Sequence, residues 1–278
     1  MSKWPKLNTL NWASFWAHFL QGIGAILTTL YLENAKNFRV PLQTHYAKWV
    51  EDVGPTNDTQ SVALVPFAAV TCAVPFLSAI AHLCMALSGY DETKSPQSSY
   101  TQRILNLKNP YRWLEYAISS TLMFFLICLL FSLYDLLLLV VLMLINVTVM
   151  WCGYLMEKYN TKETLKYGVD WTPFHFGCFL AVAQWAIVWS TVFRTIEMPA
   201  LIWAIIGTYF VLFMTFAINM GCFYRRCRNG KAALVDSFLD SYLTSERWYM
   251  VLSLVSKSLL LWLVLFGVNQ PSPYTTTQ

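Results

Sequence analysis

The feature that most constrains this chain is a series of seven long apolar stretches, separated by polar segments. Each stretch has about 20 residues or more, which is the length an α-helix needs to cross a bilayer. Only 12% of the 278 residues are charged, against about 25% in soluble proteins. The sequence therefore predicts an all-α membrane protein, a single domain over residues 1–278. Its seven spans are expected at about 12–32, 61–89, 110–134, 136–159, 173–193, 199–224 and 246–268.

The distribution of lysine and arginine predicts how these spans are oriented. Fourteen of the basic residues fall on the side of the N-terminus and the even-numbered loops, namely Lys3, Lys6, Lys94, Arg103, Lys108, Arg112, Lys158, Lys162, Lys166, Arg225, Arg226, Arg228, Lys231 and Arg247. Four fall on the other side, namely Lys36, Arg39, Lys48 and Arg194. Because cytoplasmic loops carry the excess of basic residues, we expect a cytoplasmic N-terminus and an extracellular C-terminus.

Two polar segments carry a structural expectation of their own. The outer loop 33–60 is rich in valine and aromatic residues, and we expect a small hairpin that covers the bundle. The segment 231–246 has apolar residues at helical spacing. It is predicted to be either a short amphipathic helix at the membrane surface or an extension of the seventh span.

Lys257 is the most unusual residue of the seventh span, because it lies near the centre of the apolar stretch Trp248–Trp262. A charged side chain at that depth costs roughly 2.5–3.5 kcal/mol on insertion scales. With at least ten helical residues on either side, the amine cannot easily reach the interface. Two explanations remain open: a buried ion pair, or covalent use of the amine as a Schiff base. Ser253 lies one turn before Lys257 on the same face.

Four ionisable residues of other spans share one depth, in the cytoplasmic third of the bundle. They are His18 of the first span, His82 of the second, and Arg112 and Glu115 of the third. Glu115 is the one carboxylate placed to pair with Lys257. His18, His82 and Glu115 also form a conceivable metal site, which leaves a seven-helix metal-dependent enzyme as a remote alternative.

Two peptides around these residues resemble the heliorhodopsins, which are retinal-binding proteins of inverted membrane topology. The peptides are YRWLEYAISSTLM at Tyr111–Met123 and MVLSLVSKSLLLW at Met250–Trp262. Weaker matches are AHFLQG at Ala17–Gly22, the segment around His82, and FMTFAIN at Phe213–Asn219. The resemblance covers all seven spans and implies a seven-helix bundle of rhodopsin type.

The resemblance also implies roles for individual residues. Lys257 would carry all-trans retinal covalently, as a protonated Schiff base with Glu115 as its counterion. Ser253 takes the place where ordinary microbial rhodopsins have a second, aspartate counterion. A polar proton network would include His18, His82, Arg112 and Tyr116. The retinal pocket is expected to involve Ser119, Ser120, Met123, Asn146, Met150, Trp185, Phe213 and Phe216, with Phe213 replacing the usual tryptophan of the sixth span.

The outer half of the third span argues against ion pumping. Ordinary microbial proton pumps carry a carboxylate where this chain has Leu126, and Cys128 is the one ionisable residue between Thr121 and Leu133. We therefore expect a light sensor that signals by conformational change and has no enzymatic activity. The alternative is a light-gated proton conductance that uses Asp135 and Glu197 at the outer ends.

The resemblance further implies partners and a location. We expect a multi-pass protein of the plasma membrane that contacts lipid and forms a homodimer. An unidentified cytoplasmic signalling partner is expected, and nucleic acid is not.

Overall fold

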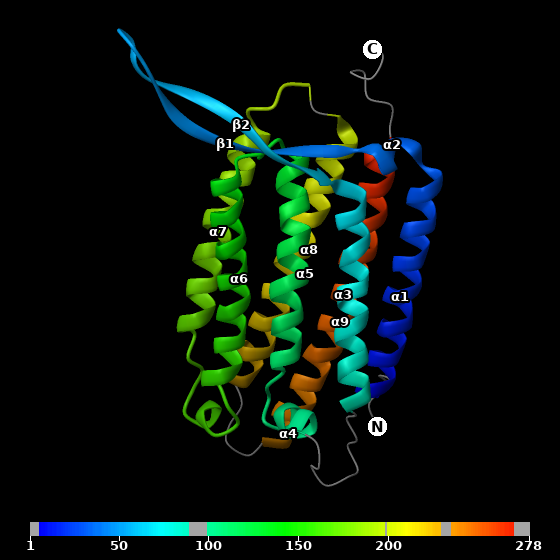
Figure 1. Cartoon of the computed structure of the whole chain (residues 1–278). Coiled ribbons are helices and arrows are strands. Elements are labelled where there is room, and N and C mark those ends of the chain that lie inside the picture. Colours follow the sequence, from blue (N-terminus) through cyan, green and yellow to red (C-terminus); the bar gives the residue numbers. More distant parts are fainter. Residues whose placement is uncertain (1–5, 89–98, 198, 229–234, 270–278) are drawn as a thin grey trace.

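The computed structural model describes residues 6–88, 99–197, 199–228 and 235–269, and its main feature is a bundle of long helices (Figure 1). Within the described residues, seven helices have more than 20 residues. They are α1 (Leu7–Tyr31), α3 (Phe67–Ser88), α5 (Pro110–Leu130), α6 (Leu136–Tyr159), α7 (Thr172–Val192), α8 (Ala200–Arg228) and α9 (Val235–Val268). The chain is thus a helical membrane bundle and a multi-pass integral membrane protein.

Helix α1 differs from the other six long helices in its apolar character. The other six are long and apolar enough to cross a membrane by length and composition. Helix α1 has 25 residues and packs against α3 and α9, with Asn11, Ser14 and His18 buried on its inner face. It begins at the lower end of the bundle in Figure 1, whereas α9 ends at the upper end. We call these the N-terminal end and the hairpin end.

An antiparallel hairpin follows the short helix α2 (Glu33–Asn37) at the hairpin end. Strand β1 (Arg39–Val50) pairs with β2 (Gly54–Pro66), lies across the end of the bundle and projects beyond it (Figure 1). The amide of Gln43 donates a hydrogen bond to the carbonyl of Tyr134 at 2.8 Å, which ties β1 to the turn before α6. The predicted hairpin is confirmed, and the bundle is therefore not purely α-helical.

The hairpin also corrects the predicted start of the second span at residue 61. Residues 61–66 form the end of β2, and α3 begins at Phe67. The run Val62–Val65 is apolar, and an apolar run of this length fits a strand as well as a helix. Pairing with β1 decides the outcome, because Val40 and Val65 are partners and both are buried.

Polar caps set several helix boundaries. Pro110 opens α5, and the Asn109 side chain accepts a hydrogen bond from the Arg112 amide at 3.3 Å. Helix α5 ends at Leu130 and not at residue 134, because the following turn contains Ser132 with a φ of 59°. Asp135 accepts from the Leu138 amide at 2.7 Å, so α6 starts where it was predicted.

At the N-terminal end of the bundle, the last two long helices are longer than predicted. Helix α8 continues to Arg228, and α9 starts at Val235, eleven residues before the predicted 246. Within the described residues, the segment predicted as 231–246 is thus an extension of the seventh span; residues 231–234 lie outside the described residues. Phe238, Tyr242 and Leu243 are buried, which explains why the extension stays on the bundle. Small helices α4 (Ser99–Leu105) and η1 (Thr164–Lys166) complete this end.

Candidate functional site

Lys257 lies inside the bundle and forms an ion pair with Glu115. Both side chains are 5% exposed, and Nζ of Lys257 contacts Oε1 of Glu115. Ser78 of α3 completes the group, because its hydroxyl lies 2.6 Å from Nζ and donates to Oε1 at 2.8 Å. Three helices, α3, α5 and α9, therefore meet at one buried charge pair, as the shared depth of Glu115 and Lys257 predicted.

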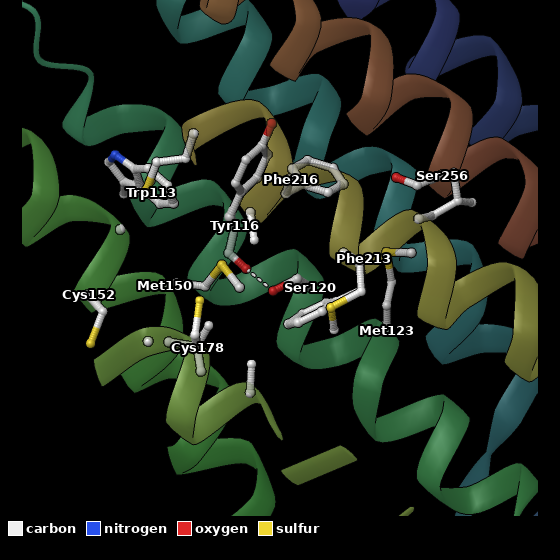
Figure 2. A pocket seen from close by; sticks show the side chains of 18 of the residues that line it. Trp113, Tyr116, Ser120, Met123, Met150, Cys152, Cys178, Phe213, Phe216 and Ser256 are labelled. Atoms are coloured by element: carbon white, nitrogen blue, oxygen red, sulfur yellow. Dashed lines mark hydrogen bonds between the residues drawn. The ribbon is translucent and has the colours of Figure 1, made fainter. Parts of the chain in front are cut away.

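A largely apolar cavity of about 250 Å³ lies between the helices, and Lys257 is one of its lining residues. Figure 2 shows the side chains around it, which come from α5, α6, α7, α8 and α9. Of the predicted pocket residues, the following line it: Lys257, Ser119, Ser120, Met123, Met150, Phe213 and Phe216. Tyr116, predicted for the proton network, lines it as well. The lining thus offers one amine in a largely apolar chamber.

Asn146 and Trp185 do not line this cavity, although both were predicted as pocket walls. Asn146 is fully buried and donates to the Ser120 hydroxyl at 3.0 Å. The Trp185 ring packs edge-on against Phe213, with 5.9 Å between the ring centroids. Both residues thus pack behind side chains that line the cavity. Ser253 is 1% exposed and also lies outside the lining.

The two histidines lie beside the charge pair and beside each other. Their rings stack with a centroid distance of 5.6 Å and an interplanar angle of 11°. Nδ1 of His82 is 3.0 Å from Oδ1 of Asn11. Among the described residues, no group of three or more His, Cys, Asp or Glu side chains is arranged to hold a metal ion. His18, His82 and Glu115, the residues of the alternative metal site, thus do not form such a group in the described structure.

Arg112 belongs to a second buried charge cluster and does not pair with Glu115. Its guanidinium contacts Glu157 of α6 and Glu246 of α9. Sequence reasoning missed both glutamates, since each lies near a predicted span end, where charges are ordinary. It also missed Ser78, because a lone serine in an apolar helix carries no signal.

The fold and this site define a class before any comparison is made. It is a helical membrane bundle with a buried lysine on its last helix, which is paired with a carboxylate and lines an apolar chamber. Solved structures of similar fold include the Exiguobacterium sibiricum rhodopsin, with a TM-score of 0.58, 16% identity, and coverage of 95% of this chain and 98% of that chain. Another is a light-driven proton pump from Leptosphaeria maculans, with a TM-score of 0.50, 11% identity, and coverage of 91% and 94%.

The heliorhodopsin family model matches residues 7–268, and the chain belongs to that family. Comparison with curated proteins gives no match. Membership makes the protein a retinal-binding photoreceptor and not an enzyme. The chamber fits such a group, because an elongated apolar molecule with one reactive end requires apolar walls and one amine.

Proposed function

We propose that this protein is a light sensor in which Lys257 holds all-trans retinal as a protonated Schiff base and Glu115 is the counterion. The observation that carries the proposal is that Lys257, which lines the apolar cavity, forms a buried ion pair with Glu115. Nζ of Lys257 is a free amine in the structure and stands for the nitrogen of the linkage. Retinal, when bound, supplies light absorption and isomerisation.

The charge pair accounts for the cost of the buried lysine. Isolated charges in a low-dielectric interior are unfavourable, and a close opposite charge with further hydrogen bonds offsets that cost. Glu115 supplies the charge, and Ser78 donates to it. Removing either charged partner leaves the other buried and unpaired, which typically costs about 3–5 kcal/mol.

Sensing is favoured over pumping by the hairpin end of the bundle. Leu126, Ile127, Cys128 and Leu129 of α5 are all at most 1% exposed and belong to a core that includes Val40 and Val65 of the hairpin. In this described part of α5, the interior beyond the cavity offers apolar packing and one thiol. The proposal keeps the predicted orientation, with the N-terminal end in the cytoplasm.

A light-gated proton conductance is the alternative, and the two outer acids give it little support. Asp135 caps α6 through the Leu138 amide. Glu197 is exposed in the turn before α8. The homodimer, the plasma membrane and the cytoplasmic partner stay predictions.

The test is the visible spectrum of the full chain expressed with all-trans retinal. We expect a visible band that bleaches with hydroxylamine and is lost in Lys257→Ala, whose folding is checked by circular dichroism. Ser258→Ala is the matched control, because Ser258 neighbours Lys257 but bonds to Gln21 and to its own helix. The proposal is refuted if folded wild-type protein shows no band, or if Lys257→Ala retains it.

Voltage clamp then separates sensing from conduction. We expect no photocurrent from the wild type under conditions where the visible band is present. A current that persists at zero driving potential would indicate pumping, and one that follows the proton gradient would indicate the conductance.

A further inference from the structure

The second charge cluster consists of Arg112, Glu157 and Glu246. It lies nearer the N-terminal end of the bundle than the Lys257–Glu115 pair, and the proposed function does not use it. Arg112 is 4% exposed, Glu157 is 3% exposed and Glu246 is 1% exposed. The guanidinium faces the two carboxylates and lies over the Tyr249 ring, 4.0 Å from its centroid. Two carboxylates therefore share one guanidinium in a buried place.

The two carboxylates differ in how well they are held. Glu157 accepts from the Asn109 amide at 2.8 Å and from the Tyr242 hydroxyl at 3.2 Å, besides Arg112. Glu246 accepts from the Asn109 side chain at 2.7 Å through Oε2. Its Oε1 faces Arg112 but has no hydrogen bond of good geometry among the described residues. Glu157 is thus held by three groups, Asn109, Tyr242 and Arg112, and Glu246 by two, Asn109 and Arg112.

A small cavity of about 10 Å³ connects this cluster with the Lys257 pair. Its lining contains polar or charged side chains of both groups, namely His82, Asn109, Arg112, Glu115, Tyr116 and Glu246. This volume accepts the centre of one water molecule. Nε of Arg112 is buried without a hydrogen-bond partner among the described residues. Buried polar atoms are usually satisfied by protein or ordered water, so this orphaned donor beside the cavity indicates a place for one ordered water.

We propose that Glu246 is a proton-binding site of the photocycle, reached from Glu115 through one water in this cavity. The inference rests on the proposed function, because the proton originates on Nζ of Lys257. The proposal adds to that function the residue that holds the proton, Glu246.

The transfer conserves charge and atoms. The proton on Nζ of Lys257 passes to the Glu115 carboxylate. Glu115 then gives a proton to the cavity water while that water gives one of its own to Glu246. Glu115 is ionised again, Glu246 becomes neutral, and the water is unchanged. A single bridging water is within the reach of general acid–base transfer.

The surroundings of Glu246 tolerate its neutral form. Once it is protonated, Arg112 still faces the ionised Glu157, so the guanidinium keeps a buried counter-charge. The titratable or charged groups that face the Glu246 site are His82 of α3, Arg112, Glu115 and Tyr116 of α5, and Glu157 of α6. Glu246 lies eleven residues before Lys257 on α9, so the proton moves toward the N-terminal end of the bundle.

The test is light-minus-dark infrared difference spectroscopy on the full chain loaded with all-trans retinal in lipid nanodiscs. We expect a carbonyl band of a newly protonated carboxylic acid when the linkage loses its proton. The band should be lost in Glu246→Gln and retained in Glu163→Gln, a control whose exposed carboxylate lies outside the cluster. A band that survives in Glu246→Gln, or that is absent from the wild type, overturns the proposal.

Two further measurements keep the result interpretable. If Glu246→Gln fails to fold, Glu246→Asp retains a carboxylate and should move the band in frequency; an unmoved band overturns the proposal. The visible spectrum of each sample reports the Lys257 linkage separately. No visible band in the wild type counts against the proposed function, whereas a normal visible band without the infrared band counts against Glu246 alone.

Discussion

Gly153 of α6 has no free space for an added methyl group, because Trp113 lies directly against it. A Cβ built at Gly153 comes within 3.0 Å of three Trp113 ring atoms, of which the farthest, Cε3, is at 2.8 Å. The ring cannot withdraw freely. Arg112 lies over it at 4.6 Å, and Tyr116 and Tyr249 pack on it with centroid distances of 6.1 and 6.0 Å.

Two opposing effects set the change in the free energy of unfolding for Gly153→Ala. Alanine in a helix interior is favoured over glycine by about 1 kcal/mol. Overpacking a closed site costs about 1–3 kcal/mol. We expect a net change between no loss and a loss of about 2 kcal/mol in the free energy of unfolding. Gly207 of α8 isolates the packing cost, since nothing lies within 4 Å of a Cβ built there. Gly207→Ala should therefore be up to about 1 kcal/mol more stable than the wild type.

The assay is thermal unfolding of both variants in one detergent, with and without retinal. Gly153→Ala should unfold several degrees below Gly207→Ala. Trp113→Phe removes the ring atoms Cζ3 and Cη2, so in that background the cost of Gly153→Ala should shrink, giving a coupling energy of about 1 kcal/mol or more. Equal midpoints for the two alanine variants, or no coupling to Trp113, would refute the packing argument.

Two further predictions concern side chains that hold polar groups. Ser78→Ala removes a donor to the buried Glu115 and should cost about 1.5–3 kcal/mol in the unfolding of retinal-free protein, whereas Ser88→Ala, at an exposed site, should leave the midpoint unchanged. Asp135→Ala removes the cap on the Leu138 amide and should cost about 1 kcal/mol, with Asp135→Asn close to the wild type; an unchanged Asp135→Ala midpoint would show that the cap does not stabilise α6.

Sequence reasoning succeeded where composition changes sharply. Helix α6 occupies Leu136–Tyr159, as predicted, because a capping aspartate precedes an unbroken apolar run. The pairing of Lys257 with Glu115 followed from counting depth along two helices, which needs only the rise per residue. Both successes rest on local signals that do not depend on how neighbouring elements pack.

The failures depend on contacts between distant segments. The strand residues 61–66 looked like the start of a span until pairing with β1 was known. Asn146 and Trp185 were expected to line the pocket, but helix rotation places each behind a residue that does. Glu157 and Glu246 became significant only because Arg112 turns toward them and away from Glu115.

The two buried charge clusters share the same two helices, and this arrangement suits a sensor. Helix α5 carries Arg112 and Glu115 three residues apart, and α9 carries Glu246 and Lys257 eleven residues apart, about three turns along the same face. A change of charge at the Lys257 pair therefore acts on rigid elements that also hold the second cluster. Because that cluster lies beside the cytoplasmic extension of α9 in the proposed orientation, a proton stored on Glu246 would weaken its tie to Arg112. The light signal would then reach the protein surface without an ion crossing the membrane.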